Sequence, residues 1–444
     1  MRSSTGTTAT APRTSPTTST GRPGRRRSRR CRTSSGTGRT PAGWTSRAAR
    51  TPIPPGSSTS TTACSSSSSS RDAPTRPRPE RNAPMKAQNL SRKNFLYLAA
   101  LASAGLLAGC SGSGEKDEPS APAATEEPAA EEASYPYDFV TKLRKSEELY
   151  ATASKTPGTV ESMTYTCHSY ALEAVDGTSD VMVDKTLYVY LPNGYDPSKQ
   201  YDILYLMHGT GDKEGYWLTT DGNNKGTSTL NLLDSMHDQG LCEDTIVVTP
   251  TYYSIPEGMD INISMSGGED GGLPEDSDPY ADEWPMYFWQ EIRNDIIPLV
   301  EAKYSTYAGG DVSEESIVAS RDHRAFAGLS RGSMTTVNSA MMHCLDYFAW
   351  YGCFSGVWAD FDEFKSILEG EFADFDVKYW YNGNGTDDFA LENHQEFVER
   401  ALEEMPDRFK DGENYSFVLF DGGVHAYNAW IVDLYNSLLC FFKS

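Results

Sequence analysis

The pentapeptide G-L-S-R-G at residues 328–332 limits how this chain can fold more strongly than any other stretch. It has the pattern G-x-S-x-G, an apolar run ending at Ala327 precedes it, and a helix-compatible segment, 333–342, follows it. A strand, a sharp turn and a helix in this order present a serine as a nucleophile at the edge of a sheet. Glycines flank the serine because a Cβ atom would clash in so tight a turn. The motif therefore predicts an enzyme whose nucleophile is Ser330.

A serine hydroxyl needs a general base, because it is a weak nucleophile at neutral pH. Of the seven histidines, His425 has the best position, since it lies in a glycine-containing loop directly after the predicted strand 415–420. Functional groups of α/β sheets gather in loops at the C-terminal ends of strands. His323, just before the strand that leads to Ser330, is expected to pack or hydrogen-bond there. A structural hydrogen bond is the alternative role for His425.

The third group is an acid that orients the imidazole and stabilises its cation. Asp387 and Asp388 follow the predicted strand 377–381 and precede His425 in the chain. The resulting order of serine, aspartate and histidine is that of α/β-hydrolases. We favour Asp388, with Asp387 as the second choice. Capping of the following helix is the alternative role for either residue.

Two backbone N–H groups are expected to hold the oxyanion that forms when the serine attacks. One belongs to Arg331, the residue directly after the nucleophile. The other belongs to Gly209 or Thr210, in the loop after the predicted strand 201–207. Glycine in this loop lets the backbone approach the substrate closely, although a plain glycine turn would have the same sequence.

The body of the chain alternates predicted strands with predicted helices. The strands are 185–191, 201–207, 245–250, 323–327, 377–381 and 415–420, and the helices are 229–239, 289–304, 333–342, 391–404 and 430–441. This alternation predicts an α/β fold with a mostly parallel central sheet and helices on both faces. No second linker interrupts residues 137–444, so we expect one catalytic domain there.

The N-terminal region differs from this body in composition. Residues 1–84 consist largely of Arg, Ser, Thr, Pro and Gly, which predicts a segment that is disordered or absent from the mature protein. Residues 85–109 begin with a methionine and have the pattern of a signal peptide: a charged start, a short apolar middle and a small-residue end. Residues 110–136, rich in Ala, Pro and Glu, predict a flexible acidic linker.

The signal peptide leads into the sequence Leu-Ala-Gly-Cys, which resembles the signal of bacterial lipoproteins. The resemblance implies cleavage before Cys110 and attachment of a lipid to its sulfur atom. The protein is then expected outside the cell, anchored to the bacterial membrane through that lipid alone. An ordinary buried helix over residues 85–109 is the alternative, although its apolar run is too short to span a bilayer comfortably.

The charge distribution argues against nucleic acid as a partner. Residues 1–84 carry sixteen arginines and two acidic residues, yet the whole chain has a net charge of −23. The remainder is therefore strongly acidic and should repel nucleic acid and anionic lipid headgroups. A basic nucleic-acid-binding tail is the alternative for residues 1–84, but no aromatic residues interrupt its arginine runs.

Cysteines and carboxylates suggest further sites. Five cysteines remain once Cys110 and the two in residues 1–84 are set aside, and an odd number cannot all pair within one chain. A disulfide between Cys344 and Cys353 is the first pairing to test. No Cys/His spacing is typical of a zinc site. The carboxylates of residues 267–283 make a calcium site conceivable, although a solvated loop is the simpler interpretation.

Several stretches together resemble the "Putative esterase" group, which includes the feruloyl and acetyl-xylan esterases of carbohydrate esterase family one. They are KTLYVYLP at 185–192, YLMHG at 205–209 and DHRAFAGLS at 322–330. GTDD at 385–388 and GGVH at 422–425 match the acid and histidine motifs of this group, whose pattern Gly-Thr-x-Asp selects Asp388. The resemblance covers residues 165–444. It implies an α/β-hydrolase fold, no cofactor, and hydrolysis of esters carried on plant polysaccharides.

Arg331 departs from this resemblance, because these esterases commonly have Met after the nucleophile. A cation there could favour an anionic or strongly polar acyl group over feruloyl.

Several aromatic residues in or near predicted loops could stack on sugar or phenolic rings, although most are expected to pack in the core or at its rim: Trp217, Tyr252, Tyr253, Trp284, Trp289 and Trp358. Two alternatives to the esterase are an acyltransferase of the mycolyltransferase kind and a surface-binding lipoprotein without catalytic activity.

Overall fold

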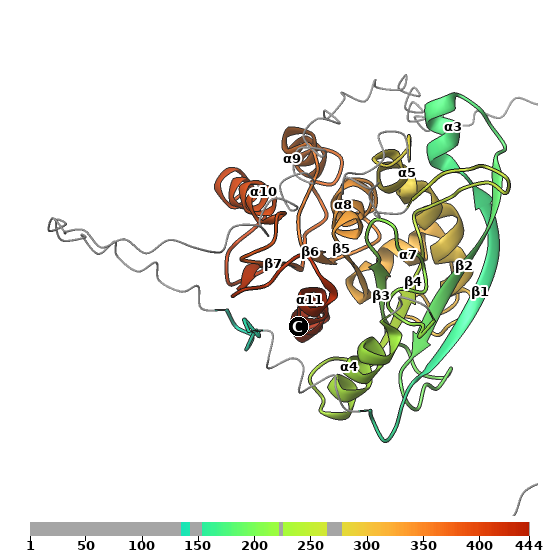
Figure 1. The fold of residues 1–444 in the computed structure, drawn as a ribbon. Coiled ribbons are helices and arrows are strands. Elements are labelled where there is room, and N and C mark those ends of the chain that lie inside the picture. The colour runs from blue at the N-terminus through green and yellow to red at the C-terminus, as the bar shows by residue number, and fades with distance from the viewer. Residues whose placement is uncertain (1–134, 143–152, 222–224, 264–277, 444) are drawn as a thin grey trace, which may run out of the picture. The chain divides into compact units, whose positions relative to one another are not determined.

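Eight strands form one sheet in the described part of the chain, in the order β1-β2-β4-β3-β5-β6-β7-β8 (Figure 1). The structure is a computed structural model that describes residues 135–142, 153–221, 225–263 and 278–443. The strands are β1 Thr159–His168, β2 Met182–Leu191, β3 Asp202–Met207, β4 Thr245–Thr249, β5 Arg324–Leu329, β6 Trp350–Phe354, β7 Tyr379–Gly385 and β8 Tyr415–Phe420. The pairs β1–β2 and β2–β4 are antiparallel and all other pairs are parallel. The predicted mostly parallel sheet is confirmed.

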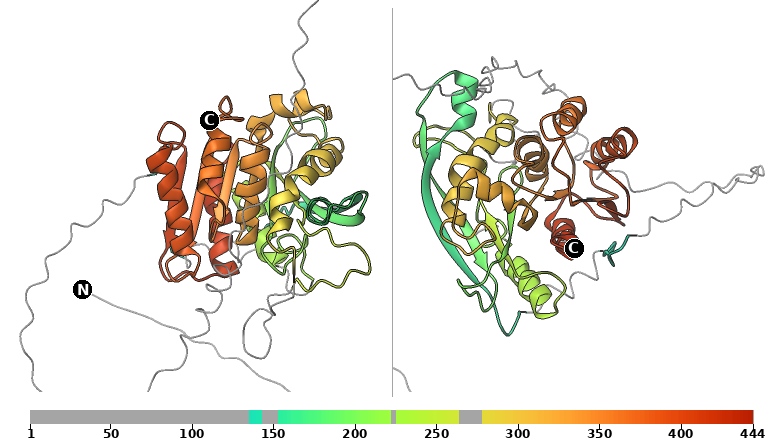
Figure 2. Two further views of the ribbon diagram at one scale, coloured as in Figure 1. Left: turned by 90° about the horizontal axis from the view of Figure 1, so that it is seen from above. Right: turned by 180° about the vertical axis from the view of Figure 1, so that it is seen from behind.

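Helices cover both faces of this sheet (Figures 1 and 2). One face carries α4 (Gly226–Asp238) and α11 (Tyr427–Cys440). The other carries α5 (Glu283–Glu291), η1 (Ile292–Ile296), α6 (Ile297–Glu301), α8 (Arg331–Thr335), η3 (Thr336–Met341), α9 (Phe361–Glu369) and α10 (Leu391–Glu404). The described residues also contain three short helices: α3 (Tyr170–Asp176), α7 (Glu314–Ala319) and η2 (Arg321–His323). None of the helices described is long and apolar enough to cross a membrane.

The side chains of the central strands divide between two cores. In β3, Tyr205 and Met207 pack into the core beneath α5, whereas Leu204 and Leu206 pack into the core beneath α4 and α11. Successive side chains of a strand point to opposite faces, and every residue of β3 is buried. Burial on both faces explains why the central strands are continuous apolar runs in the sequence.

Two strands were not predicted from the sequence. β1 has mostly exposed or half-buried positions and pairs with β2 alone, so polar residues interrupt its hydrophobic pattern. β6 is only five residues long and contains a central glycine, Gly352, which weakens the strand signal.

The predicted helix 289–304 is wrong at both ends. The helical stretch begins at Glu283, passes through the π-helical turn η1 and ends at Glu301. Pro285 lies in its first turn, where a missing backbone N–H costs no hydrogen bond, so the proline did not mark a helix end.

All five cysteines in the described residues are free and buried. The disulfide predicted between Cys344 and Cys353 is therefore wrong. The two thiols have different partners: Cys344 lies 3.9 Å from the Trp289 carbonyl, and Cys353 accepts a hydrogen bond from Trp380 at 3.4 Å. Burial raises the pKa of Cys353 to about 11, so this thiol stays protonated.

Residues 135–142 lie against the edge strand β8. The Tyr135 hydroxyl accepts a hydrogen bond from the Phe417 N–H and donates one to the Phe417 carbonyl, both at 3.2 Å. On α11, the Asn436 side chain accepts from the Val140 N–H and donates to the Val140 carbonyl, both at 2.9 Å. The segment therefore satisfies backbone groups that an edge strand would otherwise leave open.

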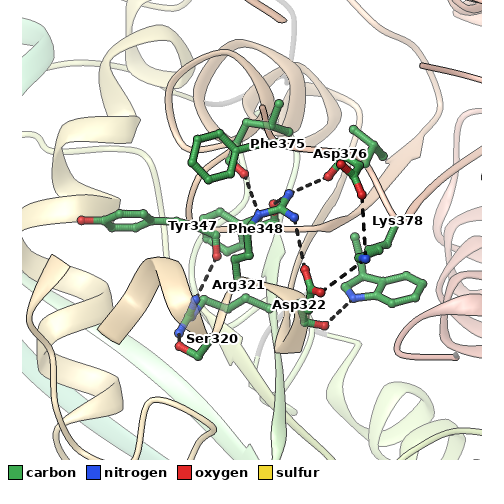
Figure 3. Close-up of polar contacts among 12 residues, drawn as sticks. Ser320, Arg321, Asp322, Tyr347, Phe348, Phe375, Asp376 and Lys378 are labelled. Atoms are coloured by element: carbon green, nitrogen blue, oxygen red, sulfur yellow. Dashed lines mark hydrogen bonds and ion pairs between the residues drawn. The ribbon is translucent and has the colours of Figure 1, made fainter. Parts of the chain in front are cut away.

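The end of the sheet opposite Ser330 is held by charged side chains (Figure 3). Arg321 donates to the carbonyls of Phe348 at 2.8 Å and Asp376 at 2.6 Å, and its Nη1 lies 3.1 Å from the Asp322 carboxylate. Lys378 reaches Asp322 at 3.4 Å. Arg321 thereby ties the start of β5 to the loops that precede β6 and β7.

Other predictions lie outside the described residues. They are the tail 1–84, the signal peptide 85–109, the lipid attachment at Cys110 and nearly all of the linker 110–136. Most of the acidic segment 267–283, with its conceivable calcium site, lies outside them too.

Candidate active site

Ser330 lies in the turn between β5 and α8, at the C-terminal edge of the sheet. Its backbone has φ 51° and ψ −116°, a conformation that non-glycine residues rarely adopt. A Cβ atom on Gly328 would lie 2.5 Å from the backbone of Gly332, and one on Gly332 would lie 2.5 Å from the His208 carbonyl oxygen. Only glycine fits at both positions, so the motif forms the strained turn that its sequence predicts.

His425 lies between Ser330 and Asp388. Its Nε2 is 3.0 Å from the Ser330 hydroxyl oxygen, and its Nδ1 is 3.0 Å and 3.1 Å from the two Asp388 carboxylate oxygens. Asp388 follows β7 and His425 follows β8, so adjacent parallel strands bring the two side chains to the same edge. With Nδ1–H donating to the carboxylate, Nε2 can accept the serine proton. This arrangement can activate a serine hydroxyl.

The Asp388 side chain is completely buried, with 0% of its surface exposed. Its burial raises the pKa, but hydrogen bonds and charge from His425, the Ala390 N–H and the Ser355 hydroxyl outweigh burial and hold the pKa of Asp388 below its usual value. The Ala390 bond is 2.8 Å long, and Ala390 precedes the first residue of α10. Asp388 therefore both faces His425 and satisfies an amide at a helix start.

Asp387, the second choice for the acid, has an exposed side chain. Its N–H donates to the Gly423 carbonyl at 2.9 Å. Asp387 thus supports the loop that carries His425 through its backbone, and the geometry favours Asp388 as the partner of the imidazole.

The loop after β3 passes beside Ser330. A Cβ atom on Gly209 would lie 2.5 Å from the end of the Leu329 side chain and 3.4 Å from the Ser330 Cβ, so a larger residue here would displace the buried Leu329 side chain. Arg331 is the first residue of α8, and the first N–H groups of a helix have no partner within it. The structure thus places Gly209 and Arg331 next to the serine, and a side-chain hydrogen bond joins Thr210 to Arg331.

His208 holds the backbone of the loop after β3 through a hydrogen bond, a role that the sequence did not suggest. Its Nδ1 lies 2.7 Å from the Gly209 carbonyl and its Nε2 lies 2.8 Å from the Thr251 hydroxyl. Burial lowers the pKa of His208 to about 3, so the ring is neutral and its Nδ1–H donates to Gly209. Because a peptide unit is planar and trans, fixing the Gly209 carbonyl turns the Thr210 N–H to the opposite side.

The Arg331 side chain binds other side chains of the protein. Its Nε donates to the Thr210 hydroxyl at 2.9 Å, and its Nη1 lies 3.5 Å from the Asp282 carboxylate. The Arg331 side chain is only 3% exposed. A buried cation that is already paired is a poor ligand for a substrate anion. The structure therefore gives no support to the attraction for an anionic acyl group that the sequence suggests.

Aromatic rings surround the imidazole. The ring centre of Phe389 is 4.4 Å from that of His425, and Trp430 lies edge-on to His425 at 5.1 Å and 88°. Neither residue was singled out in the sequence, because no local pattern marks them.

Of the aromatic residues considered in the sequence, Trp217, Tyr252 and Trp284 are almost completely buried and pack in the core. His323 hydrogen-bonds Asp202 at 2.7 Å and stacks on Tyr307, as expected.

Comparison with protein-family models and with curated proteins finds similar sequences. A family model described as "Putative esterase" matches residues 180–441. Endo-1,4-beta-xylanase Y of Acetivibrio thermocellus is 32% identical over 321 residues, which are 70% of this chain but 25% of the xylanase. The chain thus spans about a quarter of the length of this curated relative.

Two solved structures are similar to the described fold. One is a serine-to-alanine mutant of the feruloyl esterase module from Clostridium thermocellum, complexed with sinapinate. It is 28% identical with a TM-score of 0.54, and the match covers 70% of this chain and 97% of that chain. The other, a structure named FAE, is 30% identical with the same TM-score and coverage.

Proposed function

The chain belongs to the "Putative esterase" family, and from this membership we propose that it is a serine esterase that hydrolyses feruloyl or acetyl esters on plant polysaccharides. The observation that carries the proposal is the position of His425, within 3.0 Å of the Ser330 hydroxyl and of the Asp388 carboxylate. Support for the substrate class comes from the similar feruloyl esterase module, which binds sinapinate, and from the similar segment of a xylanase.

In the proposed reaction, the Ser330 hydroxyl attacks the ester carbonyl while His425 takes its proton. The imidazolium then gives this proton to the departing alcohol, and the acyl group stays on the serine. Asp388 keeps the imidazole in one tautomer and stabilises its cation. The N–H groups of Arg331 and of Thr210 or Gly209 hold the oxyanion. Water, activated by His425, then releases the carboxylic acid.

Replacement of the nucleophile tests the proposal. We expect Ser330→Ala to lose nearly all hydrolysis of p-nitrophenyl acetate and methyl ferulate while keeping the melting temperature of the wild type. Mass spectrometry after labelling with a fluorophosphonate should find the adduct on Ser330 and nowhere else. Retained hydrolysis in Ser330→Ala would refute the mechanism. Product analysis with sugar acceptors present separates hydrolysis from acyl transfer.

We also propose export and anchoring through a lipid on Cys110. The support is the pattern of residues 85–110, a signal peptide that leads into Leu-Ala-Gly-Cys. Labelling of producing bacteria with a radioactive fatty acid should mark the protein, and Cys110→Ser should remove the label. Equal labelling of both proteins would contradict the anchor.

A further inference from the structure

Ser355 has an unusual backbone conformation for a buried serine. It directly follows β6, which lies between β5 and β7, the strands that lead to Ser330 and Asp388. Its φ is 60°, and the residue is completely buried. Residues other than glycine seldom adopt a positive φ, because the Cβ atom crowds the backbone. Such strain persists only where surrounding contacts hold it, and it gathers at functional sites.

Two hydrogen bonds hold Ser355 in place. Its N–H donates to the Gly383 carbonyl on β7 at 2.9 Å, and the Trp430 indole N–H donates to its hydroxyl oxygen at 2.8 Å. Because an indole nitrogen can only donate, the Ser355 oxygen is the acceptor and its own proton is left for another group. Geometry places this hydroxyl near the Asp388–His425 pair, because Trp430, which binds Ser355, also packs against His425, whose Nδ1 binds Asp388. The same hydroxyl contributes to the lowered pKa of Asp388.

The contact with His425 does not by itself fix the Asp388 carboxylate. The imidazole Nδ1 is nearly equidistant from the two carboxylate oxygens, at 3.0 Å and 3.1 Å. The Ala390 N–H binds one oxygen at 2.8 Å. A hydroxyl donor from the residue after β6 would add a second fixed point and oppose rotation of the carboxylate.

We propose that Ser355 is a positioning residue: its hydroxyl, aimed by Trp430, donates to Asp388 and fixes the carboxylate that orients His425. The inference rests on the proposed function, in which these side chains act on Ser330. Trp430 serves the same arrangement twice, because its ring packs edge-on against His425 while its N–H binds Ser355.

Ser355→Gly tests this role without straining the fold. Glycine tolerates a φ of 60° and removes the hydroxyl. The relief of backbone strain offsets part of the cost of leaving the Trp430 N–H without its acceptor, so the melting temperature should change little. We expect kcat for p-nitrophenyl acetate to fall about tenfold with KM unchanged, the effect of losing one hydrogen bond to a charged group. The low-field NMR signal of the His425 Nδ1 proton should also shift. Wild-type kcat together with an unmoved signal would overturn the proposal.

Two further variants keep the test decisive if Ser355→Gly fails to fold. Ser355→Ala should show the same loss of kcat, and Trp430→Phe, which keeps the ring but loses the N–H, should lower kcat about threefold because the hydroxyl is no longer aimed. Full kcat in both would overturn the proposal. Ser437→Ala is the matched control, because it removes another buried hydroxyl that donates only to the Leu434 carbonyl, and it should keep wild-type kcat.

The outcomes separate this inference from the proposed function. Activity retained in Ser330→Ala would refute the esterase mechanism itself. An inactive Ser330→Ala beside a fully active Ser355→Gly would refute only the role of Ser355.

Discussion

The Arg331 guanidinium donates to the Thr210 hydroxyl at 2.9 Å, and this bond ties the residue after the nucleophile to the loop beyond β3. The same two residues offer backbone N–H groups for the proposed oxyanion site. Two donors that act on one oxygen atom must be held at a fixed separation. The bond between the two side chains therefore helps to fix the distance between the two N–H groups, which belong to segments far apart in the chain.

Thr210→Val removes the hydroxyl acceptor and keeps the shape and the backbone N–H of residue 210. We expect kcat to fall roughly tenfold with little change in KM, since the looser donor acts mainly on the transition state. Arg331→Met should have a similar effect, and the double variant should be little worse than either single one. Additive losses in steady-state kinetics would show that the two side chains act independently.

Asp388→Asn should lower kcat by about 10³ to 10⁴, because an amide accepts no hydrogen bond through its NH₂ group and favours the wrong imidazole tautomer. Asp387→Asn is the matched control, with an exposed side chain one residue away, and should keep most of the activity. Hydrolysis of methyl ferulate by both variants checks the assignment. A larger loss in Asp387→Asn than in Asp388→Asn would reverse it.

Asp433 is fully buried on α11, and burial raises its pKa well above the usual range, with a smaller raising effect from the Asp388 charge. The folded state therefore keeps a proton that the unfolded chain releases above about pH 4, so this residue makes stability fall as pH rises. Asp433→Asn has no carboxyl group at this position, so it should not show this loss of stability as pH rises.

Melting temperatures of the wild type and Asp433→Asn across pH 4 to 8 measure the effect. We expect the two proteins to be close near pH 4 and the variant to gain steadily toward pH 8. A difference that does not change with pH would contradict a protonated Asp433 in the folded state.

Lys185 and Glu291 form an ion pair at 2.7 Å, with side chains 3% and 2% exposed. Lys185→Met leaves the Glu291 carboxylate buried without its cation, and we expect it to cost about 3–5 kcal/mol in the free energy of unfolding. Lys185→Met combined with Glu291→Leu should recover much of this loss, because no isolated charge remains. Urea unfolding measures both, and a double variant weaker than Lys185→Met alone would contradict the explanation.

The sequence predicted the parts of the site whose chemistry is local. Ser330 lies between glycines that only a tight turn requires, and His425 and Asp388 lie in short loops directly after recognisable strands. Each pattern spans fewer than ten residues, so it could be interpreted without knowledge of the sheet order. The central strands were predicted for the same reason, since burial on both faces leaves an unbroken apolar run.

The supporting residues could not be predicted in this way. Ser355 matters only because β6 lies between β5 and β7, and β6 itself is short and interrupted by Gly352. Trp430 reaches Ser355 from a helix 75 residues further along the chain. The burial of the Arg331 side chain depends on Asp282 and Thr210, which come from distant segments. Such contacts depend on the assembled fold.

The hydroxyl of Tyr135 has a consequence for how the protein should be produced. It satisfies both the N–H and the carbonyl of Phe417, in the strand where the sheet ends. A shortened protein that began after residue 142 would present that strand as an open template for another copy. We expect such a protein to self-associate through β8, so the choice of first residue would decide between a monodisperse preparation and an aggregating one.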